Sequence, residues 1–259
     1  MNTQVWIGII LPFLGTCLGA ATVFVLKDRI SNSVQRMLSG FAAGVMVAAS
    51  FWSLLQPSLD GAAHMGRMSF IPAAVGFLLG IGFLQLMDNV TPHMHIDGQS
   101  EGSKRSLKPK AMLLMAVTLH NIPEGMAIGI IYAGWVAGDT GVSKAGALAL
   151  ALGVALHNFP VGAIVSMPLR TAGVPKAKAF WYGVLSGIVE PIASLITIAA
   201  ASAVVPILPY LLAFAAGAMF YVVIEELIPE MSAGQHSNMG AVVFSLGFVL
   251  MMVLEVALE

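Results

Sequence analysis

The residues best suited to chemistry lie in two related segments, each in the middle of a long apolar run. Their sequences are HNIPEG at 120–125 and HNFPVG at 157–162. In a helix, His120 and Glu124 are four residues apart and lie on one face with Asn121. That face presents an imidazole, a carboxylate and an amide oxygen, a set that suits Zn(II), Fe(II), Mn(II) or a similar divalent metal. Ionisable groups inside apolar segments are by default a functional site.

Each segment also contains a proline, Pro123 in the first and Pro160 in the second. A proline has no amide hydrogen to donate to the carbonyl four residues before it. We therefore expect two kinked helices with free carbonyls that meet at the same depth. Broken helices at mid-membrane are where transporters place ion sites.

Further polar residues are expected at this depth. Ser186, Glu190 and Ser194 follow one another at four-residue spacing, and Met46 and Ser53 share a face of an earlier apolar run. A structural interpretation stays open for two of them. A buried Glu190 can be hydrogen-bonded to a neighbouring helix, and a methionine at helical spacing, such as Met46, is more typical of packing than of metal binding.

The composition places these segments in a membrane. Of 259 residues, 58% are hydrophobic and 10% are charged, and the mean hydropathy is +0.89, whereas a soluble domain has roughly 45–50% apolar and about 25% charged residues. The net charge of −1 indicates no nucleic-acid partner. The single cysteine, Cys17, excludes an internal disulfide and a thiolate-rich zinc site.

A membrane-spanning helix needs about 20 apolar residues, and this length predicts an all-α integral membrane protein with eight transmembrane helices. The chain then forms one domain, 1–259. The expected spans are about 5–26, 34–56, 70–90, 111–133, 145–167, 179–203, 207–229 and 238–257. Residues 91–110 are polar and contain glycine and serine, which indicates a flexible cytoplasmic loop. Ten of the twelve Lys and Arg residues fall in alternate loops, which places both termini outside.

The sequence also contains internal repeats. Besides the two HN-x-P segments, FAAGVM at 41–46 is echoed by FAAGAM at 214–219. In the expected topology both pairs cross the membrane in opposite directions, as in inverted-repeat transporters with a site at the repeat interface. Small-residue pairs at four-residue spacing, such as Gly15 with Gly19 and Gly40 with Gly44, permit close helix packing and allow a homodimer without requiring one.

Taken together, these motifs give a family resemblance along nearly the whole chain. They are the eight spans, HNIPEG at 120–125, the related segment at 157–162, Glu190-Pro191, and ELIPE at 226–230. The chain resembles the ZIP (Zrt/Irt-like) family of divalent-metal transporters, and most of all its bacterial GufA-type branch. The resemblance implies a multi-pass protein of the bacterial inner membrane that moves Zn(II), and also Fe(II), Mn(II) or Cd(II), into the cytoplasm. The implied partners are the metal ion and the lipid bilayer, with no organic cofactor.

The resemblance also implies where the metal binds. It assigns a first position to Met46, His120, Asn121 and Glu124, a second to Asn121, Glu124, Asn158 and Glu190, a route in to Ala49 and Ser53, and a route out to Glu225 and Glu226. One residue departs from the family pattern. Where the two-metal members usually have a bridging glutamate, this chain has Val161, so the fifth span offers His157 and Asn158 but no acid. Two cations a few ångströms apart repel strongly in a low dielectric, and we therefore expect one well-occupied metal.

Two other functions are consistent with these residues. A membrane metal sensor would bind the ion without transporting it, with Val161 as the change that disables transport. An intramembrane metalloenzyme would need an activated water and usually an H-E-x-x-H helix. Asn121 occupies the position after the histidine here, and the chain is therefore predicted not to be an enzyme.

Overall fold

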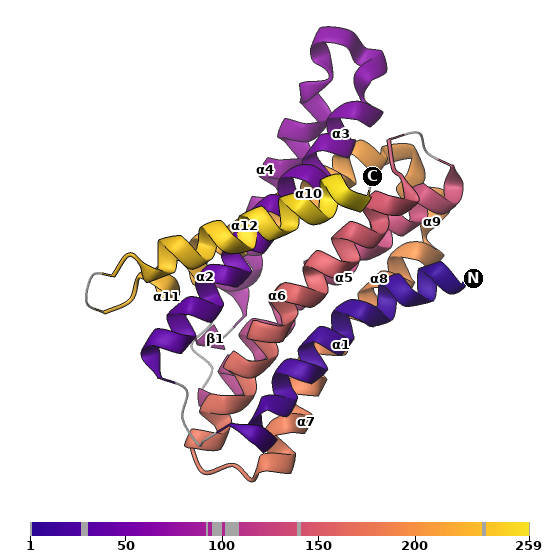
Figure 1. Cartoon of the computed structure of the whole chain (residues 1–259). Coiled ribbons are helices and arrows are strands. Elements are labelled where there is room, and N and C mark those ends of the chain that lie inside the picture. Colours follow the sequence, from indigo (N-terminus) through magenta and orange to yellow (C-terminus); the bar gives the residue numbers. More distant parts are fainter. Residues whose placement is uncertain are drawn as a thin grey trace.

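The computed structural model describes residues 2–26, 31–91, 93–94, 100–101, 109–138, 141–234 and 237–258 (Figure 1). These residues are almost entirely helical. The elements are α1 (Thr3–Val25), α2 (Asn32–Ala49), η1 (Ser50–Leu55), α3 (Gln56–Gly61), η2 (Ala63–Met68), α4 (Phe70–Val90), β1 (His93–Met94), β2 (Ser100–Glu101), α5 (Pro109–Ala137), α6 (Lys144–Thr171), α7 (Lys176–Gly187), α8 (Val189–Ala199), α9 (Ala201–Val204), η3 (Val205–Ile207), α10 (Leu208–Val222), η4 (Val223–Leu227), α11 (Ile228–Ser232) and α12 (Met239–Leu258).

Seven helical stretches of the described chain are long and apolar enough to cross a membrane. They are Thr3–Val25, Asn32–Gly61, Phe70–Val90, Lys144–Thr171, Lys176–Ala199, Ala201–Ser232 and Met239–Leu258. The predicted class, an all-α membrane protein, is thereby confirmed, while the count of eight spans stays a prediction. The remaining expected span lies in α5, which has 29 residues and contains the polar segment 120–125. Large apolar side chains such as Leu18, Leu78 and Ile196 are more than half exposed, as contact with lipid requires.

The helices pack in pairs. α1 lies along α6, α2 along α12, α4 along α10 and α5 along α8, and Figure 1 shows α1 beside α6. Glycines make these contacts close. A Cβ atom at Gly15 would lie 2.2 Å from the carbonyl oxygen of Ala155, and one at Gly44 would lie 2.0 Å from that of Phe244. The predicted packing through small residues is therefore confirmed.

The internal repeat is visible in the backbone. α2 and α10, which carry the echoed segments 41–46 and 214–219, both run into a π-helical turn, Ser50–Leu55 in one and Val223–Leu227 in the other. The turn begins nine residues after the phenylalanine that opens each segment. π-Turns interrupt the regular hydrogen-bond ladder and occur frequently at functional sites.

The structure adds one helix break to the two kinks predicted at prolines, and those kinks stay a prediction. Pro123 lies inside the continuous helix α5, and Pro160 lies inside the continuous helix α6. The sixth expected span is interrupted at Ile188, between α7 and α8. Pro191 cannot donate to the carbonyl of Gly187, and the break falls two residues before Glu190.

The predicted topology places both termini on the same side of the membrane, and the structure agrees with this part of it. Figure 1 shows both termini at the end opposite the turn between α6 and α7. Which end faces the cytoplasm stays a prediction. Within the expected loop 91–110, β1 and β2 pair antiparallel, with His93 opposite Glu101, and α5 already begins at Pro109. Residues 92, 95–99 and 102–108 of that loop lie outside the described chain.

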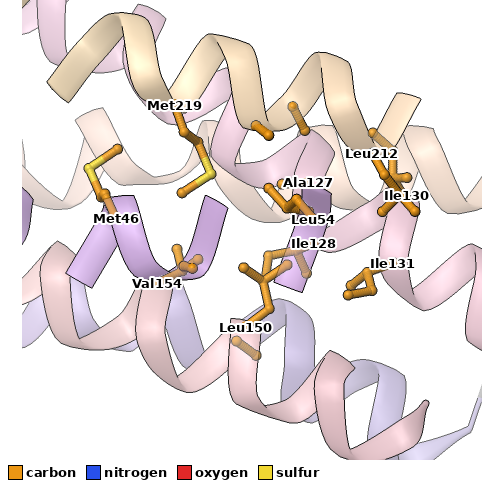
Figure 2. Packing of buried hydrophobic residues seen from close by; sticks show 14 of the residues in the cluster. Met46, Leu54, Ala127, Ile128, Ile130, Ile131, Leu150, Val154, Leu212 and Met219 are labelled. Atoms are coloured by element: carbon orange, nitrogen blue, oxygen red, sulfur yellow. The ribbon is translucent and has the colours of Figure 1, made fainter. Parts of the chain in front are cut away.

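A continuous apolar core lies where the helix pairs meet. Met46 of α2 and Met219 of α10 are both 1% exposed and belong to one buried cluster with residues of α5 and α6. Figure 2 shows these two methionines at one end of the cluster, with Val154 and Leu150 of α6 below them. Because Met46 and Met219 are equivalent in the repeat, the two halves of the chain meet through matching side chains.

Candidate metal site

A buried pair of ionisable side chains joins α5 to α6. Nε2 of His157 lies 3.2 Å from Oε2 of Glu124, and the two residues are 0% and 3% exposed. His157 comes from the second of the predicted polar segments and Glu124 from the first. The packing of α5 on α6 therefore joins the two segments, as expected from the sequence.

A second buried contact links α6 to α8. Nδ2 of Asn158 donates to Oε2 of Glu190 at 2.7 Å, and it also lies 3.3 Å from the carbonyl oxygen of Pro12. The other carboxylate oxygen of Glu190, Oε1, accepts a hydrogen bond from Oγ1 of Thr16 at 3.2 Å. Residues of α1, α6 and α8 therefore converge on one carboxylate.

Several polar atoms in this region have no hydrogen-bond partner among the described residues. They are Oε2 of Glu124, both ring nitrogens of His157 and Oδ1 of Asn158, all of them buried. Burying such atoms unpaired costs free energy, and each case in a folded protein calls for an explanation. Imidazole nitrogens, carboxylate oxygens and amide oxygens are also the atoms that bind divalent metals. The atoms of this cluster that lack hydrogen bonds are thus all of types that bind divalent metals.

Close backbone contact between α5 and α8 sets the positions of Glu124 and Glu190. A Cβ atom at Gly125 would lie 2.4 Å from the carbonyl oxygen of Glu190, so only glycine allows this approach. Oγ of Ser194 donates to the carbonyl oxygen of Gly125 at 2.8 Å. Asn121 of α5 is held against α7, because its Nδ2 donates to the carbonyl oxygen of Ser186 at 2.9 Å.

His120 belongs to a different cluster of side chains from Glu124. Its Nδ1 lies 3.1 Å from Oε2 of Glu226, and its Nε2 lies 3.9 Å from Oδ1 of Asp88. His120 and Glu124 share a helix, but they reach partners on different helices. Glu225, the neighbour of Glu226, is exposed. In the predicted orientation the cluster of Asp88, His120 and Glu226 is on the cytoplasmic side of the central pair.

On the opposite side, Ser53 donates a hydrogen bond to Oε1 of Glu255. Both residues are buried, and so is Ala49, one helical turn before Ser53. Met46 lies in the apolar core and packs against other buried apolar side chains. The structure therefore groups Glu124, His157, Asn158 and Glu190 in one place and leaves Met46 in the apolar cluster.

The repeat relates the two flanking clusters to each other. Ser53 and Glu226 each occupy the fourth position of a π-helical turn, in η1 and η4. Asp88 lies eight residues after Gly80, which packs against the carbonyl oxygen of Phe214. Glu255 lies eight residues after Gly247, which packs against the carbonyl oxygen of Phe41, the residue equivalent to Phe214 in the repeat. Ser53 with Glu255 is thus the counterpart of Glu226 with Asp88.

Sequence reasoning missed three of these residues: Asp88, Glu255 and Thr16. A signal for the two acids exists, because the third and eighth expected spans share the pattern F-x-L-G followed by seven residues and an acid, at 77–88 and 244–255. Threonine in an apolar helix gives no comparable signal.

Val161 faces apolar neighbours. It is half-buried and packs against the small cluster that includes Val165 and Val117. In the described part of the chain, no three His, Cys, Asp and Glu side chains are grouped closely enough to enclose a metal ion. Asparagine is not one of these four residue types, and the amide oxygens of Asn121 and Asn158 are further potential ligands.

Comparison with known proteins identifies the family. The family model described as ZIP Zinc transporter matches residues 95–255. Zinc transporter ZIP11 of Xenopus tropicalis is 36% identical, over 98% of this chain and 97% of that protein. Zinc transporter GufA of Myxococcus xanthus is 33% identical, over 94% of both chains, and zinc transporter ZIPB of Bordetella bronchiseptica is 36% identical, over 95% of this chain and 78% of that protein. The chain therefore belongs to the ZIP family of zinc transporters.

Proposed function

We propose that the protein carries a divalent metal ion, with Zn(II) as its principal substrate, across the cell membrane into the cytoplasm. Fe(II), Mn(II) and Cd(II) suit the same nitrogen and oxygen ligands. The family and the names of the relatives support transport, and the multi-pass helical fold supports a membrane location. None of the relatives named above is called an enzyme.

One observation carries the proposal. The buried side chains of His157, Glu124 and Asn158 keep ligand atoms without hydrogen-bond partners among the described residues, in the middle of a helical bundle. A carboxylate at this depth is costly unless a cation or several donors face it. A metal ion that draws together His157, Glu124 and the amide oxygens would satisfy these atoms. The free-energy cost of leaving these atoms unsatisfied in the empty site favours metal binding.

The flanking clusters define the rest of the route. The ion enters past Ser53 and Glu255, binds at the central residues, and leaves past His120, Glu226 and Asp88. These flanking clusters are equivalent in the inverted repeat, which suits a route that is open from alternate sides. His120 and Glu124 are successive ligands on this route, because they share a helix face but reach different partners.

The test is uptake of radiolabelled zinc into proteoliposomes. The native chain should show saturable uptake, and Glu124→Gln should abolish it, because the amide keeps the size of the side chain but removes its charge. Asp60→Asn is the matched control, since Asp60 is an exposed acid bonded only to Gln56 in the structure's described contacts. Its uptake should equal that of the native chain.

The outcomes separate transport from sensing. A native chain that binds zinc in equilibrium dialysis but moves none would indicate a membrane metal sensor, and uptake gained by Val161→Glu would trace the loss to the absent acid. Equal uptake by Glu124→Gln and the native chain would contradict the proposed site. Zinc-dependent cleavage of a membrane substrate by the purified protein would favour an enzyme.

A further inference from the structure

The first helix contributes a side chain to the central site. Oγ1 of Thr16 lies 3.2 Å from Oε1 of Glu190, although the two residues are 174 positions apart in sequence. Both are buried, at 0% and 1% exposure. None of the residues expected from the sequence to bind or guide the metal lies on α1.

Close packing fixes where this hydroxyl lies. A Cβ atom at Gly162 of α6 would lie 2.2 Å from the carbonyl oxygen of Thr16, and one at Gly187 of α7 would lie 2.8 Å from its Cγ2. Gly15 and Gly19 hold α1 against α6 on either side of Thr16 through equally close backbone contacts. The threonine is thus wedged between two helices, and its side chain has little freedom to rotate.

The two oxygens of Glu190 have different partners. Thr16 bonds Oε1, whereas Asn158 bonds Oε2 through its Nδ2 and keeps its own Oδ1 unpaired. The Thr16 hydroxyl is tied to a tightly packed helix. The Asn158 amide can exchange its nitrogen and oxygen by rotation, which would turn the unpaired Oδ1 and Oε2 of Glu190 toward one ion.

We propose that Thr16 is a positioning residue for metal binding: it holds Oε1 of Glu190 and thereby leaves Oε2 aimed at the metal shared with Asn158. This inference rests on the proposed function, because it assumes that Glu190 is a metal ligand. Groups that orient a ligand in this way typically account for 10- to 100-fold in metal affinity. Thr16 touches the ligand and not the metal.

The test is zinc binding to the purified full-length protein, measured by titration calorimetry. Thr16→Val keeps the shape of the side chain and removes the hydroxyl, so we expect an affinity about 10- to 100-fold weaker. Thr16→Ser keeps the hydroxyl and should bind nearly as tightly as the native chain. Thr22→Val is the matched control on the same helix, since Oγ1 of Thr22 donates only to the carbonyl oxygen of Gly19 in its described contacts.

A double-mutant cycle separates positioning from packing. In a Glu190→Gln background, Thr16→Val should have no further effect on affinity, because the carboxylate that it orients is absent. An undiminished effect in that background, or Thr16→Ser binding as weakly as Thr16→Val, would overturn the proposal in favour of packing. If Thr16→Val does not fold, Thr16→Ala takes its place in the same cycle.

The same measurements distinguish the two proposals. If the native chain binds no zinc, or if Glu124→Gln binds it as well as the native chain does, the proposed metal site itself fails. If Glu124→Gln abolishes binding while Thr16→Val binds like the native chain, the site stands and only the role of Thr16 is wrong.

Discussion

Nε2 of His157 lies within ion-pair distance, 3.2 Å, of Oε2 of Glu124, and neither atom has a hydrogen-bond partner among the described residues. The geometry brings a potential nitrogen ligand and a potential oxygen ligand together in a contact that is not a hydrogen bond. A metal ion placed between them would supply the missing interaction. The pair therefore makes His157, and not only Glu124, central to metal binding.

Replacing His157 by glutamine should weaken zinc binding by 100-fold or more, because losing a direct ligand costs at least as much as losing its outer partner, about 10- to 100-fold. Titration calorimetry on the purified chain measures this. His64→Gln is the control, since His64 is exposed and its Nδ1 lies 3.3 Å from the carbonyl oxygen of Gly61. Native affinity in His157→Gln would remove His157 from the ligand set.

The cluster on the predicted cytoplasmic side should control release more than binding. Glu226 contacts His120 at 3.1 Å, whereas the adjacent Glu225 is exposed. We expect Glu226→Gln to lower the maximal rate of zinc uptake about tenfold or more, a change of about 1.4 kcal/mol in the barrier, with little change in affinity. Glu225→Gln should be close to native. If Glu225→Gln lowered the maximal rate of uptake into proteoliposomes more than Glu226→Gln did, the route would lie on the other side of the helix.

The cluster on the predicted outer side should act on capture of the ion. Glu255 is the repeat counterpart of Asp88 and accepts a hydrogen bond from Ser53. Glu255→Gln should raise the half-saturating zinc concentration severalfold, because a buried charge that attracts the cation is lost. Ser245→Ala on the same helix is the control, since Ser245 is exposed and bonds within its own turn. An unchanged half-saturating concentration in Glu255→Gln would exclude Glu255 from the route.

The number of metal ions bound per chain should depend on whether the side chain at position 161 is negatively charged. Val161 packs against apolar side chains, so a second cation near His157 and Asn158 would lack one of its negative partners. We expect one tightly bound zinc per native chain and two in Val161→Glu, counted by elemental mass spectrometry after dialysis. Val161→Gln, which is polar but uncharged, should stay at one. Two metals in the native chain would contradict the prediction.

The sequence alone supports the class of fold and the segments that matter. Apolar runs of membrane-spanning length are visible without a structure, and the polar segments 120–125 and 157–162 stand out because they interrupt such runs. The repeat of 41–46 in 214–219 can also be read directly, and the π-helical turns follow each copy at the same distance.

The pairing of side chains could not be predicted in the same way. His120 and Glu124 share a helix face, yet they meet Glu226 and His157, because helix rotation and neighbour choice depend on packing across the whole bundle. Asp88 lies near the end of its helix, where an acid usually indicates a solvated terminus. The break at Ile188, between α7 and α8, was likewise not predicted, because the sequence shows the sixth span as one apolar run.

The contact between Gly125 and Glu190 should be intolerant of any side chain. A Cβ at Gly125 would lie 2.4 Å from the carbonyl oxygen of Glu190 and 2.7 Å from its Cα, so Gly125→Ala must push α5 and α8 apart. Overpacking of this kind costs about 1–3 kcal/mol, and we expect a lower midpoint of thermal unfolding in detergent together with weaker zinc binding.

Gly82→Ala is the matched control for that change. Gly82 lies in α4 with nothing within 4 Å of a Cβ at its position, and alanine is favoured over glycine inside a helix by about 0.5–1 kcal/mol. Its unfolding midpoint should therefore equal or exceed that of the native chain. If Gly125→Ala is as stable as Gly82→Ala and binds zinc normally, α5 and α8 are not held at backbone contact, and the position of Glu190 must be set by Thr16 and Asn158 alone.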